Sequence, residues 1–206
     1  MSGRKGETSY KETAFGILPR SRLIPLEIEG IGRAWNFVLH KVNRRTQITP
    51  EFLKEIHRVG FAWILPDVGG RFRKVEVEVS RHHPAVFYRV PQLMKDFCDD
   101  LCVRLQHLPA ISHDLFLVSL IGLLAWAHHR FLWIHPFLDY NGRLARLLNN
   151  IILLKLNLPP IELQVETKRK RAAYVKALQE ADRGNMKPLE GLVERAIVEA
   201  VQELTK

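Results

Sequence analysis

The sequence predicts an all-α protein, a helical bundle that carries one small β-hairpin. Apolar residues recur at intervals of three or four along most of the chain, which is the period of amphipathic helices. The stretch after Gly69-Gly70 instead alternates residue by residue, as a β-strand does. With 206 residues and 47% hydrophobic content, the chain can bury one sizeable core, so we expect a single domain.

The first two helices are expected on either side of residue 45. The first spans about Pro25 to Val42, and the apolar residues expected on its core face are Ile24, Ile28, Ile31, Trp35, Val38 and Val42. The second is expected to begin at Pro50, because Thr49 can cap it and proline suits the first helical position.

The hairpin is expected over residues 72–88. Val75, Val77 and Val79 alternate with charged residues, and β-branched and aromatic residues resume after a turn near residues 82–84.

Helical periodicity returns at Pro91 and continues to about Leu108. The next helix, from Ser112 to Trp133, is apolar nearly all round, which predicts a buried central helix. Its most apolar part, residues 115–127, is shorter than the roughly 20 residues that a membrane-spanning helix needs.

Three further helices are expected after "HPFLDYN". The first presents a core face of Leu144, Leu147, Leu148, Ile151 and Leu154, and ends at Asn157 because the following prolines cannot continue it. The second lies in "ETKRKRAAYVKALQEADRGN" and is expected to stop at Gly184. The apolar face expected in the last helix is Leu189, Leu192, Val193, Ala196, Ile197, Ala200, Val201 and Leu204.

Composition narrows the class of partner and the compartment. The net charge of +9 and the pI near 9.8 suggest an anionic partner, which leaves nucleic acid, a nucleotide and an acidic protein surface open. The N-terminus lacks the apolar core of a secretory signal, so we expect a cytoplasmic protein, with export as an effector by another route still open. Cys98 and Cys102 share one helix face without a second cysteine pair, which favours reduced, packed thiols over a metal site or a disulfide.

The stretch "IHPFLDYNGRLARLL", residues 134–148, concentrates the chemistry of the chain. A turn followed by a helix that starts near Gly142 presents unpaired backbone N–H groups and the positive end of the helix dipole, which together bind anions. Arg143, Arg146 and Asn150 lie on the helix face opposite the leucines, so two guanidinium groups can reach an anion held there. This geometry suits a polyphosphate.

Two residues before this helix complete a site for phosphate chemistry. Asp139 can hold Mg²⁺, which binds phosphates through one or two carboxylates and keeps several waters. His135 is the nearby side chain that can accept a proton at neutral pH. The two residues together predict activation of a nucleophile beside a metal-bound phosphate.

The motif "HPFLDYNGRLAR" resembles the signature of the Fic (Fido) family, in which His-x-Phe-x-(Asp/Glu)-(Gly/Ala)-Asn-(Gly/Lys)-Arg precedes a second arginine. The resemblance extends from about Thr49 to Val193 and includes "HRVGFAWI", "GGRFRKVEVEV" and "RAAYVKALQEADRGNMKPLEGLV". It implies a Fic-type helical bundle with the hairpin as its flap. The expected division is an N-terminal extension at 1–48 and a Fic core with C-terminal helices at 49–206.

The resemblance implies a protein adenylyltransferase that moves AMP from ATP to a Ser, Thr or Tyr hydroxyl of a target protein. His135 would deprotonate the hydroxyl, and Asp139 would hold Mg²⁺ on the α and β phosphates. Arg143 and Arg146 would bind the β and γ groups. The catalytic residues implied are His135, Asn141 and Arg143.

The resemblance assigns four further parts. Asn141 and the backbone around Gly142 would cradle the phosphates, and Phe137 would anchor the loop in the core. Tyr174 would form a wall of the adenine pocket. The flap at 72–88 would clamp the target peptide by strand addition.

Tyr140 departs from the family pattern, which has Gly or Ala at this position. A tyrosine adds bulk and disfavours a positive φ. We expect its side chain to swing outward and change little; the alternative is an altered rate or nucleotide choice.

An inhibitory glutamate is expected in the first helix. Many Fic proteins carry a Ser/Thr-x-x-x-Glu-(Gly/Asn) motif whose glutamate pairs with the second signature arginine. Glu29-Gly30 fits the end of that motif, although Pro25 replaces the Ser or Thr, while Glu12 in "TSYKET" is a weaker candidate. A solvated Glu29, or restraint by a separate antitoxin chain, are the alternatives.

Three other functions are compatible with parts of this sequence. A Fic fold that uses another nucleotide, or one that has lost catalysis and serves as a scaffold, would keep the same motif. A basic nucleic-acid-binding module is less favoured, because the sequence lacks a helix-turn-helix glycine pattern and an aromatic stripe. The run at 168–171, "KRKR", fits a solvated helix start better than a nucleic-acid contact.

Overall fold

A computed structural model describes residues 10–79 and 82–204. The helices and strands, in chain order, are β1 (Tyr10–Thr13), β2 (Gly16–Pro19), α1 (Arg20–Lys41), α2 (Pro50–Phe61), the 3-10 turn η1 (Phe87–Arg89), α3 (Val90–Gln106), α4 (Phe116–Ile134), α5 (Asn141–Lys155), α6 (Lys168–Asp182) and α7 (Lys187–Leu204). Strands β1 and β2 form an antiparallel pair. The predicted all-α class is confirmed, and one small hairpin is present, although at residues 10–19.

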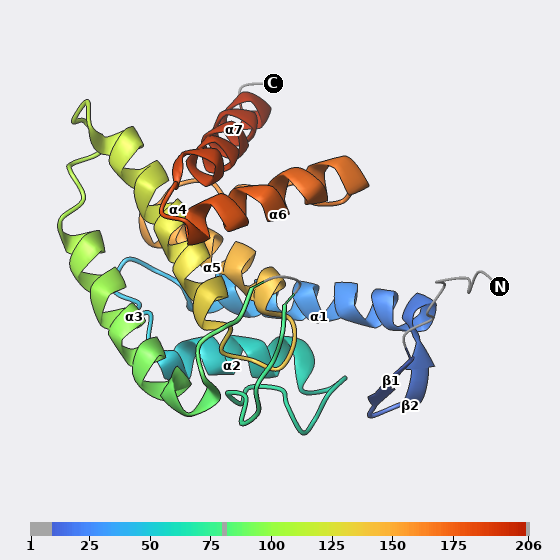
Figure 1. The fold of residues 1–206 in the computed structure, drawn as a ribbon. Coiled ribbons are helices and arrows are strands. Elements are labelled where there is room, and N and C mark those ends of the chain that lie inside the picture. Colours follow the sequence, from blue (N-terminus) through green and yellow to red (C-terminus); the bar gives the residue numbers. More distant parts are fainter. Residues whose placement is uncertain (1–9, 80–81, 205–206) are drawn as a thin grey trace.

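Helix α4 lies at the centre of the bundle, with α3, α5, α6 and α7 packed around it, while α1 and α2 run side by side at one end (Figure 1). By length and composition α4 could cross a membrane, but half of its apolar window is buried among the other helices. A core helix of a helical bundle can have the same length and apolar composition. The burial of α4 agrees with the central helix predicted from its apolar sequence.

Helix α1 turns a different face inward from the one predicted. Its buried residues are Leu23, Glu27, Gly30, Ala34 and Val38. Ile24 and Ile28, both expected in the core, are exposed. Gly30 sets this orientation, because a Cβ there would lie 2.4 Å from the carbonyl oxygen of Gly60 in α2. The close approach of the two helices therefore places Glu27, one turn earlier on the same face, inside the protein.

The hairpin does not lie at 72–88, where it was predicted. Within residues 72–79 and 82–88, pairing is limited to isolated bridges of Phe72 with Phe137 and of Val79 with His82. The buried guanidinium of Arg73 provides the reason, since it donates hydrogen bonds to the carbonyl oxygens of Val75 and Ala85. Those backbone groups are thus satisfied by a side chain instead of a strand ladder.

Several predicted boundaries are confirmed. The Thr49 hydroxyl accepts a hydrogen bond from the Phe52 N–H with Pro50 at the helix start, and Gly184 follows α6 with a φ of 89°. Asn157, with a φ of 59°, follows the end of α5. Cys98 is a buried free thiol as expected, whereas Cys102 is free but exposed.

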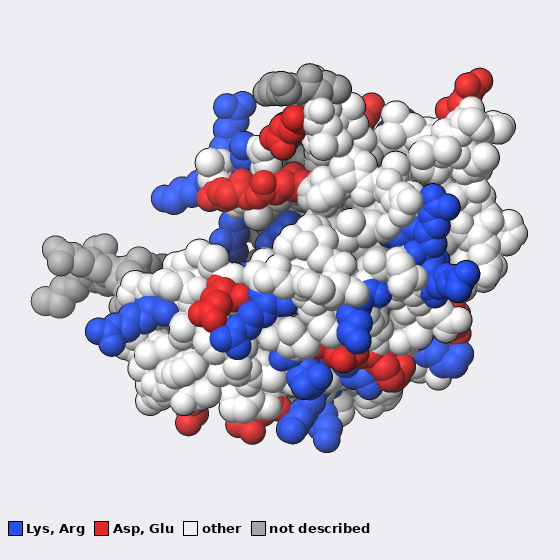
Figure 2. All heavy atoms as spheres, turned by 180° about the vertical axis from the view of Figure 1, so that it is seen from behind, with Lys and Arg blue, Asp and Glu red and all other residues white. Residues whose placement is uncertain are grey.

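The basic residues do not form one surface on the face shown in Figure 2. There the described Lys and Arg side chains lie in several groups, with Asp and Glu side chains between them. A nucleic-acid site is favoured by a continuous basic stripe, and this face does not present one.

Candidate functional site

The loop between α4 and α5 carries the signature residues, and its two ends are unusual backbone positions. His135 ends α4 with a φ of 52° and Tyr140 precedes α5 with a φ of 63°, both in the left-handed region. The side chain of Asn141 closes the loop: its Oδ1 accepts from the Phe137 N–H at 3.0 Å and its Nδ2 donates to the Phe137 carbonyl at 2.7 Å. The buried amide of Asn141 thus shapes the loop, which differs from the expected direct role at the phosphates.

His57 in α2 packs against this loop and forms a hydrogen bond with it. Its ring stacks on Phe137 with centroids 3.9 Å apart and an interplanar angle of 7°. Nδ1 accepts a hydrogen bond from the Gly70 N–H at 2.9 Å, so Nε2 carries the proton and donates to the Asp139 carbonyl at 3.1 Å. Burial lowers the pKa of His57 to about 3 and keeps the imidazole neutral.

Arg73 holds the other end of the loop. Its Nε donates to the His135 carbonyl oxygen at 2.8 Å, and Nη2 donates to the Ile134 carbonyl oxygen at 3.3 Å. These carbonyls belong to the last residue of α4 and to its C-cap, where the positive charge of an arginine also interacts favourably with the negative end of the helix dipole. The guanidinium therefore positions the backbone of the predicted base.

The His135 side chain lines a cavity of about 130 Å³ between α4, α6 and the segment before η1. His82, Leu132 and Asp182 also line it, and the Asp182 carboxylate accepts from His129 Nε2 at 2.9 Å. Burial lowers the pKa of His135 to about 4. The imidazole is thus neutral at pH 7 and able to take a proton.

The start of α5 has the geometry on which the prediction of an anion site depends. The first intrahelical bond runs from the Leu144 N–H to the Tyr140 carbonyl, so the N–H groups of residues 141–143 precede the hydrogen-bond ladder. A Cβ at Gly142 would lie 3.8 Å from Arg146 Nη1, which places that guanidinium beside the helix start. Arg143, Arg146 and Asn150 line a common cavity of about 290 Å³ with residues of α1 and the segment 160–163.

A carboxylate of α1 already lies at this anion site, but it belongs to Glu27. Glu27 is 1% exposed and accepts from Arg143 Nη2 at 2.5 Å and from Arg20 Nη1 at 2.9 Å. Glu29 has a half-exposed side chain, paired with Arg33 one turn along the same helix. The predicted contact of Glu29 with the second signature arginine is therefore wrong, because Gly30 packs against α2 and turns Glu29 outward.

Asp139, the carboxylate predicted to hold Mg²⁺, lies in the loop just before α5. Its Oδ1 accepts from the Tyr140 N–H at 2.6 Å, while its Oδ2 pairs with Lys11 of β1. The side chain is 38% exposed. Among the described residues no cluster of three His, Cys, Asp or Glu side chains could hold a metal alone, so the phosphates and waters would supply the other ligands.

Tyr140 does not swing outward as predicted. Its side chain is 3% exposed and stacks on Phe61 with centroids 4.0 Å apart, in a second apolar cluster with Leu23, Ile64 and Leu65. Burial raises its pKa to about 12. The backbone nevertheless keeps the left-handed turn at which the family has a small residue.

Tyr174 lies behind the site and outside the His135 cavity. Its hydroxyl is 2.7 Å from His128 Nε2. Burial raises its pKa to about 12, against the opposing effect of the Arg146 guanidinium. Tyr174 therefore lies near Arg146, and its predicted role as a wall of the adenine pocket stays a prediction.

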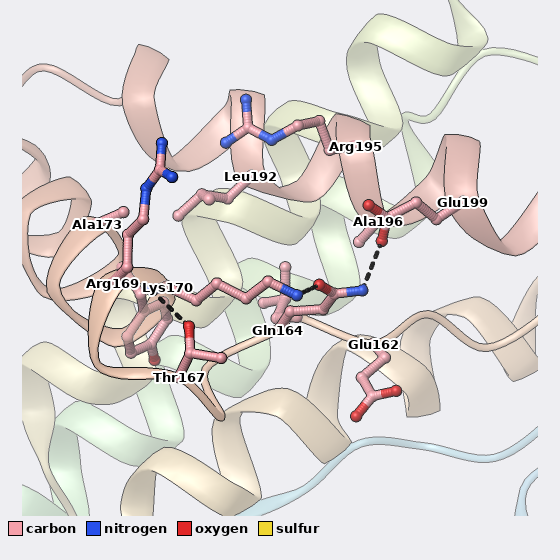
Figure 3. A pocket seen from close by; sticks show the side chains of 12 residues that line it. Glu162, Gln164, Thr167, Arg169, Lys170, Ala173, Leu192, Arg195, Ala196 and Glu199 are labelled. Atoms are coloured by element: carbon pink, nitrogen blue, oxygen red, sulfur yellow. Dashed lines mark hydrogen bonds between the residues drawn. The ribbon is translucent and has the colours of Figure 1, made fainter.

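The cavity that Tyr174 does line, of about 330 Å³, lies between α6, α7 and the segment before α6. Figure 3 shows Lys170 of α6 directed toward Gln164, which donates to Glu199 of α7 at 3.0 Å. Arg169 and Arg195 point away from this bridge. These contacts link the two helices and lie outside the signature loop.

The helical bundle and its signature loop are those expected of a Fic-type protein. The chain belongs to the Fic/DOC family, whose model matches residues 47–153, just over half of the chain. A protein of Nematostella vectensis named Protein adenylyltransferase Fic is 31% identical over 185 residues, which cover 89% of this chain and 40% of that protein. A protein of the same name from Culex quinquefasciatus is 34% identical over 163 residues, covering 79% and 30%. The chain therefore spans less than half the length of these curated relatives.

A solved structure agrees with the fold. Fic-1 from C. elegans superposes with a TM-score of 0.69 at 28% sequence identity, covering 86% of this chain and 49% of that chain.

Four residues that shape the site were not predicted: Lys11, Glu27, His57 and Arg73. His57 stands in a stretch quoted for the resemblance, and a histidine in an otherwise apolar helix face is a signal for a buried hydrogen bond. Glu27 is the charged member of an i, i+3, i+7 face with Gly30 and Ala34, which is also visible in the sequence. Lys11 and Arg73 act across long sequence separations, so local patterns do not indicate them.

Proposed function

We propose that the chain is a protein adenylyltransferase that transfers AMP from ATP to a Ser, Thr or Tyr hydroxyl of a target protein, with release of pyrophosphate. The observation that carries this proposal is the position of His135, one short loop before a helix start that is flanked by Arg143 and Arg146. The names of the curated relatives support both the adenylyl donor and the protein acceptor.

In the proposed reaction His135 takes the proton of the incoming hydroxyl, whose oxygen attacks the α-phosphorus while pyrophosphate leaves. Arg143, Arg146 and the N–H groups around Gly142 stabilise the charge on the phosphates. Three residues act indirectly, because they hold the loop that carries these groups: Asn141, His57 and Arg73.

Mg²⁺ is proposed to enter with ATP and to bind Asp139 Oδ2 together with phosphate oxygens and water. It would supply positive charge between the α and β phosphates. A single, partly exposed carboxylate with one oxygen already fixed by the Tyr140 N–H suits this mode of binding.

The target peptide is proposed to dock along residues 74–79 and 82–86. The described part of this segment has backbone pairing limited to the Val79–His82 bridge, and Val75 is exposed. Arg73 ties its start to the His135 backbone, so a strand added here would run past the base.

Glu27, in place of Glu29, is proposed to restrain the enzyme. Its carboxylate forms the ion pair with Arg143 that a phosphate would need, and the pair is largely buried. Glu27→Gln should raise self-labelling and ATP affinity about tenfold, because a neutral amide competes less well for a guanidinium. Glu29→Gln, on the exposed face of the same helix, is the matched control and should behave as the wild type. Equal labelling by all three proteins would reject the restraint and leave a separate antitoxin chain as the alternative.

The proposed function is tested by incubating the chain with ATP labelled at the α-phosphate, Mg²⁺ and a cell lysate. We expect labelled protein with the wild type and none with His135→Ala, whose fold and nucleotide affinity should be kept because the imidazole acts on the hydroxyl. Label transferred from GTP or CTP in preference to ATP would reject ATP as the donor. No label from any nucleotide, with tight nucleotide binding, would indicate a catalytically silent scaffold.

A further inference from the structure

The N-terminal hairpin places the ammonium group of Lys11 on Asp139 Oδ2, the oxygen proposed to bind the metal. Lys11 of β1 forms an ion pair with Asp139 Oδ2, and its Nζ lies 5.1 Å from the centroid of the Tyr140 ring. The other carboxylate oxygen is fixed by the Tyr140 N–H at 2.6 Å. The ammonium therefore takes the Asp139 oxygen that remains for an outside cation.

At the neighbouring helix start, the positive charge of Arg143 is likewise paired with a carboxylate of the same chain, that of Glu27. Glu27 accepts hydrogen bonds from Arg20 and Arg143 at 2.9 and 2.5 Å. A carboxylate thus stands at the arginine that would bind phosphate, and an ammonium stands at the carboxylate that would bind metal. The two ion pairs together close the site with groups of the chain itself.

Among the described residues, the hairpin that carries Lys11 contacts α1, the signature loop and the segment after α2. Near its turn the Ala14 N–H donates to the Ile64 carbonyl at 2.9 Å, and the Phe15 ring meets the edge of Trp63 at 5.8 Å. Tyr10, Phe15 and Ile17 are largely exposed. A two-stranded hairpin with so little buried surface is only marginally stable, so it can detach while the bundle stays folded.

We propose that Lys11 is an internal competitor of the divalent cation, so that metal and nucleotide load only when hairpin β1–β2 leaves Asp139. Magnesium approaches a carboxylate oxygen to about 2.0–2.1 Å, and an ammonium on the same oxygen excludes it by volume and by like charge. This inference rests on the proposed function only in taking Asp139 as the metal ligand.

The first test measures metal binding without turnover. Binding of Mn²⁺ is followed by electron paramagnetic resonance in the presence of a non-hydrolysable ATP analogue. Lys11→Met, which keeps the apolar stem against Tyr140, should bind Mn²⁺ about three to ten times more tightly than the wild type. Lys95→Met is the control, since Lys95 pairs with Asp99 on the exposed side of α3, and it should leave the affinity unchanged. Equal Mn²⁺ affinity in Lys11→Met and the wild type would overturn the proposal.

The second test measures the position of the hairpin in the wild type. Hydrogen exchange of the Ala14 amide, which bonds to Ile64 only when the hairpin is docked, should become faster when Mn²⁺ and the analogue saturate the site. Unchanged or slower exchange on saturation would show that the hairpin stays in place, and would overturn the proposal.

Asp139→Asn separates this inference from the proposed function. If the variant loses Mn²⁺ affinity while Lys11→Met gains none, the competitor role fails and the metal role of Asp139 stands. If Asp139→Asn binds Mn²⁺ as the wild type does, the metal role and the competitor role fail together, whatever the transfer of α-label shows about His135.

Discussion

Replacing His57 by phenylalanine tests how the catalytic loop is held. The new ring can keep the stacking on Phe137, which has centroids 3.9 Å apart, but it loses both hydrogen bonds of the imidazole. The Gly70 N–H and the Asp139 carbonyl would then lack these partners beside a fully buried side chain. An unpaired group costs about 1–3 kcal/mol when buried and less when it is partly exposed, as these two are, so His57→Phe should lower the free energy of unfolding by about 1–4 kcal/mol at pH 7.

The pH dependence makes this prediction specific to the imidazole. Burial lowers the pKa of His57 to about 3, whereas a histidine in an unfolded chain titrates near 6.5. Below about pH 6.5 the unfolded chain therefore binds a proton that the folded chain does not, and stability falls as the pH falls toward 3. From pH 7 to pH 5 this loss is about 2 kcal/mol for one such histidine.

Urea unfolding of both proteins at pH 7 and pH 5 provides the assay. The fall in unfolding free energy from pH 7 to pH 5 should be about 2 kcal/mol smaller in His57→Phe than in the wild type. His128, whose pKa burial also lowers to about 3, titrates in both proteins and cancels in the difference. The same fall in both proteins would mean that His57 titrates normally, and would refute the buried, neutral imidazole.

Three other predictions concern the loop and its base. Tyr140→Gly removes a non-glycine residue from a left-handed backbone position, which should stabilise the fold by about 1–2 kcal/mol. The variant also loses a buried ring, so urea unfolding should show a net loss of stability of about 1–4 kcal/mol. A transfer rate that rises about tenfold, near 1.4 kcal/mol, would mean that the native ring damps activity. Arg73→Lys loses the fork that reaches the His135 and Ile134 carbonyls, so kcat should fall at least about tenfold with nucleotide affinity kept, and unchanged transfer kinetics would contradict that role. Because burial lowers the pKa of His135 to about 4, the kcat/KM profile should be flat from about pH 6 to 8 and fall only toward pH 4, and an acidic limb near pH 6.5 would show an imidazole that titrates as if exposed.

Most helices were predictable because their signals are local. Thr49 and Pro50 mark the start of α2, Gly184 marks the end of α6, and the leucines of α5 repeat with the helical period. The signature motif places His135 at the end of one helix and Arg143 in the first turn of the next, as its spacing predicts. Each of these features depends on residues within a few positions of one another.

The errors arose where contacts outside the apolar pattern decide the structure. The alternating valines after Phe72 predict a strand, but the Arg73 guanidinium satisfies backbone carbonyls there and replaces the strand ladder. Apolar periodicity predicts an inward Ile28, yet the approach of Gly30 to Gly60 rotates Glu27 inward instead. Residues 10–19 form the sheet, and the Ala14 N–H at their turn donates to the Ile64 carbonyl after α2, a contact that no local pattern indicates.

The measurement that tests the central claim most directly compares ATP labelled at the α-phosphate with ATP labelled at the γ-phosphate, using wild type and His135→Ala. Attack on the α-phosphorus leaves AMP on the target, so protein should retain the α label, lose the γ label as pyrophosphate, and show neither label with His135→Ala. Retention of the γ label on protein, or equal α labelling by the two proteins, would contradict AMP transfer with His135 as the base.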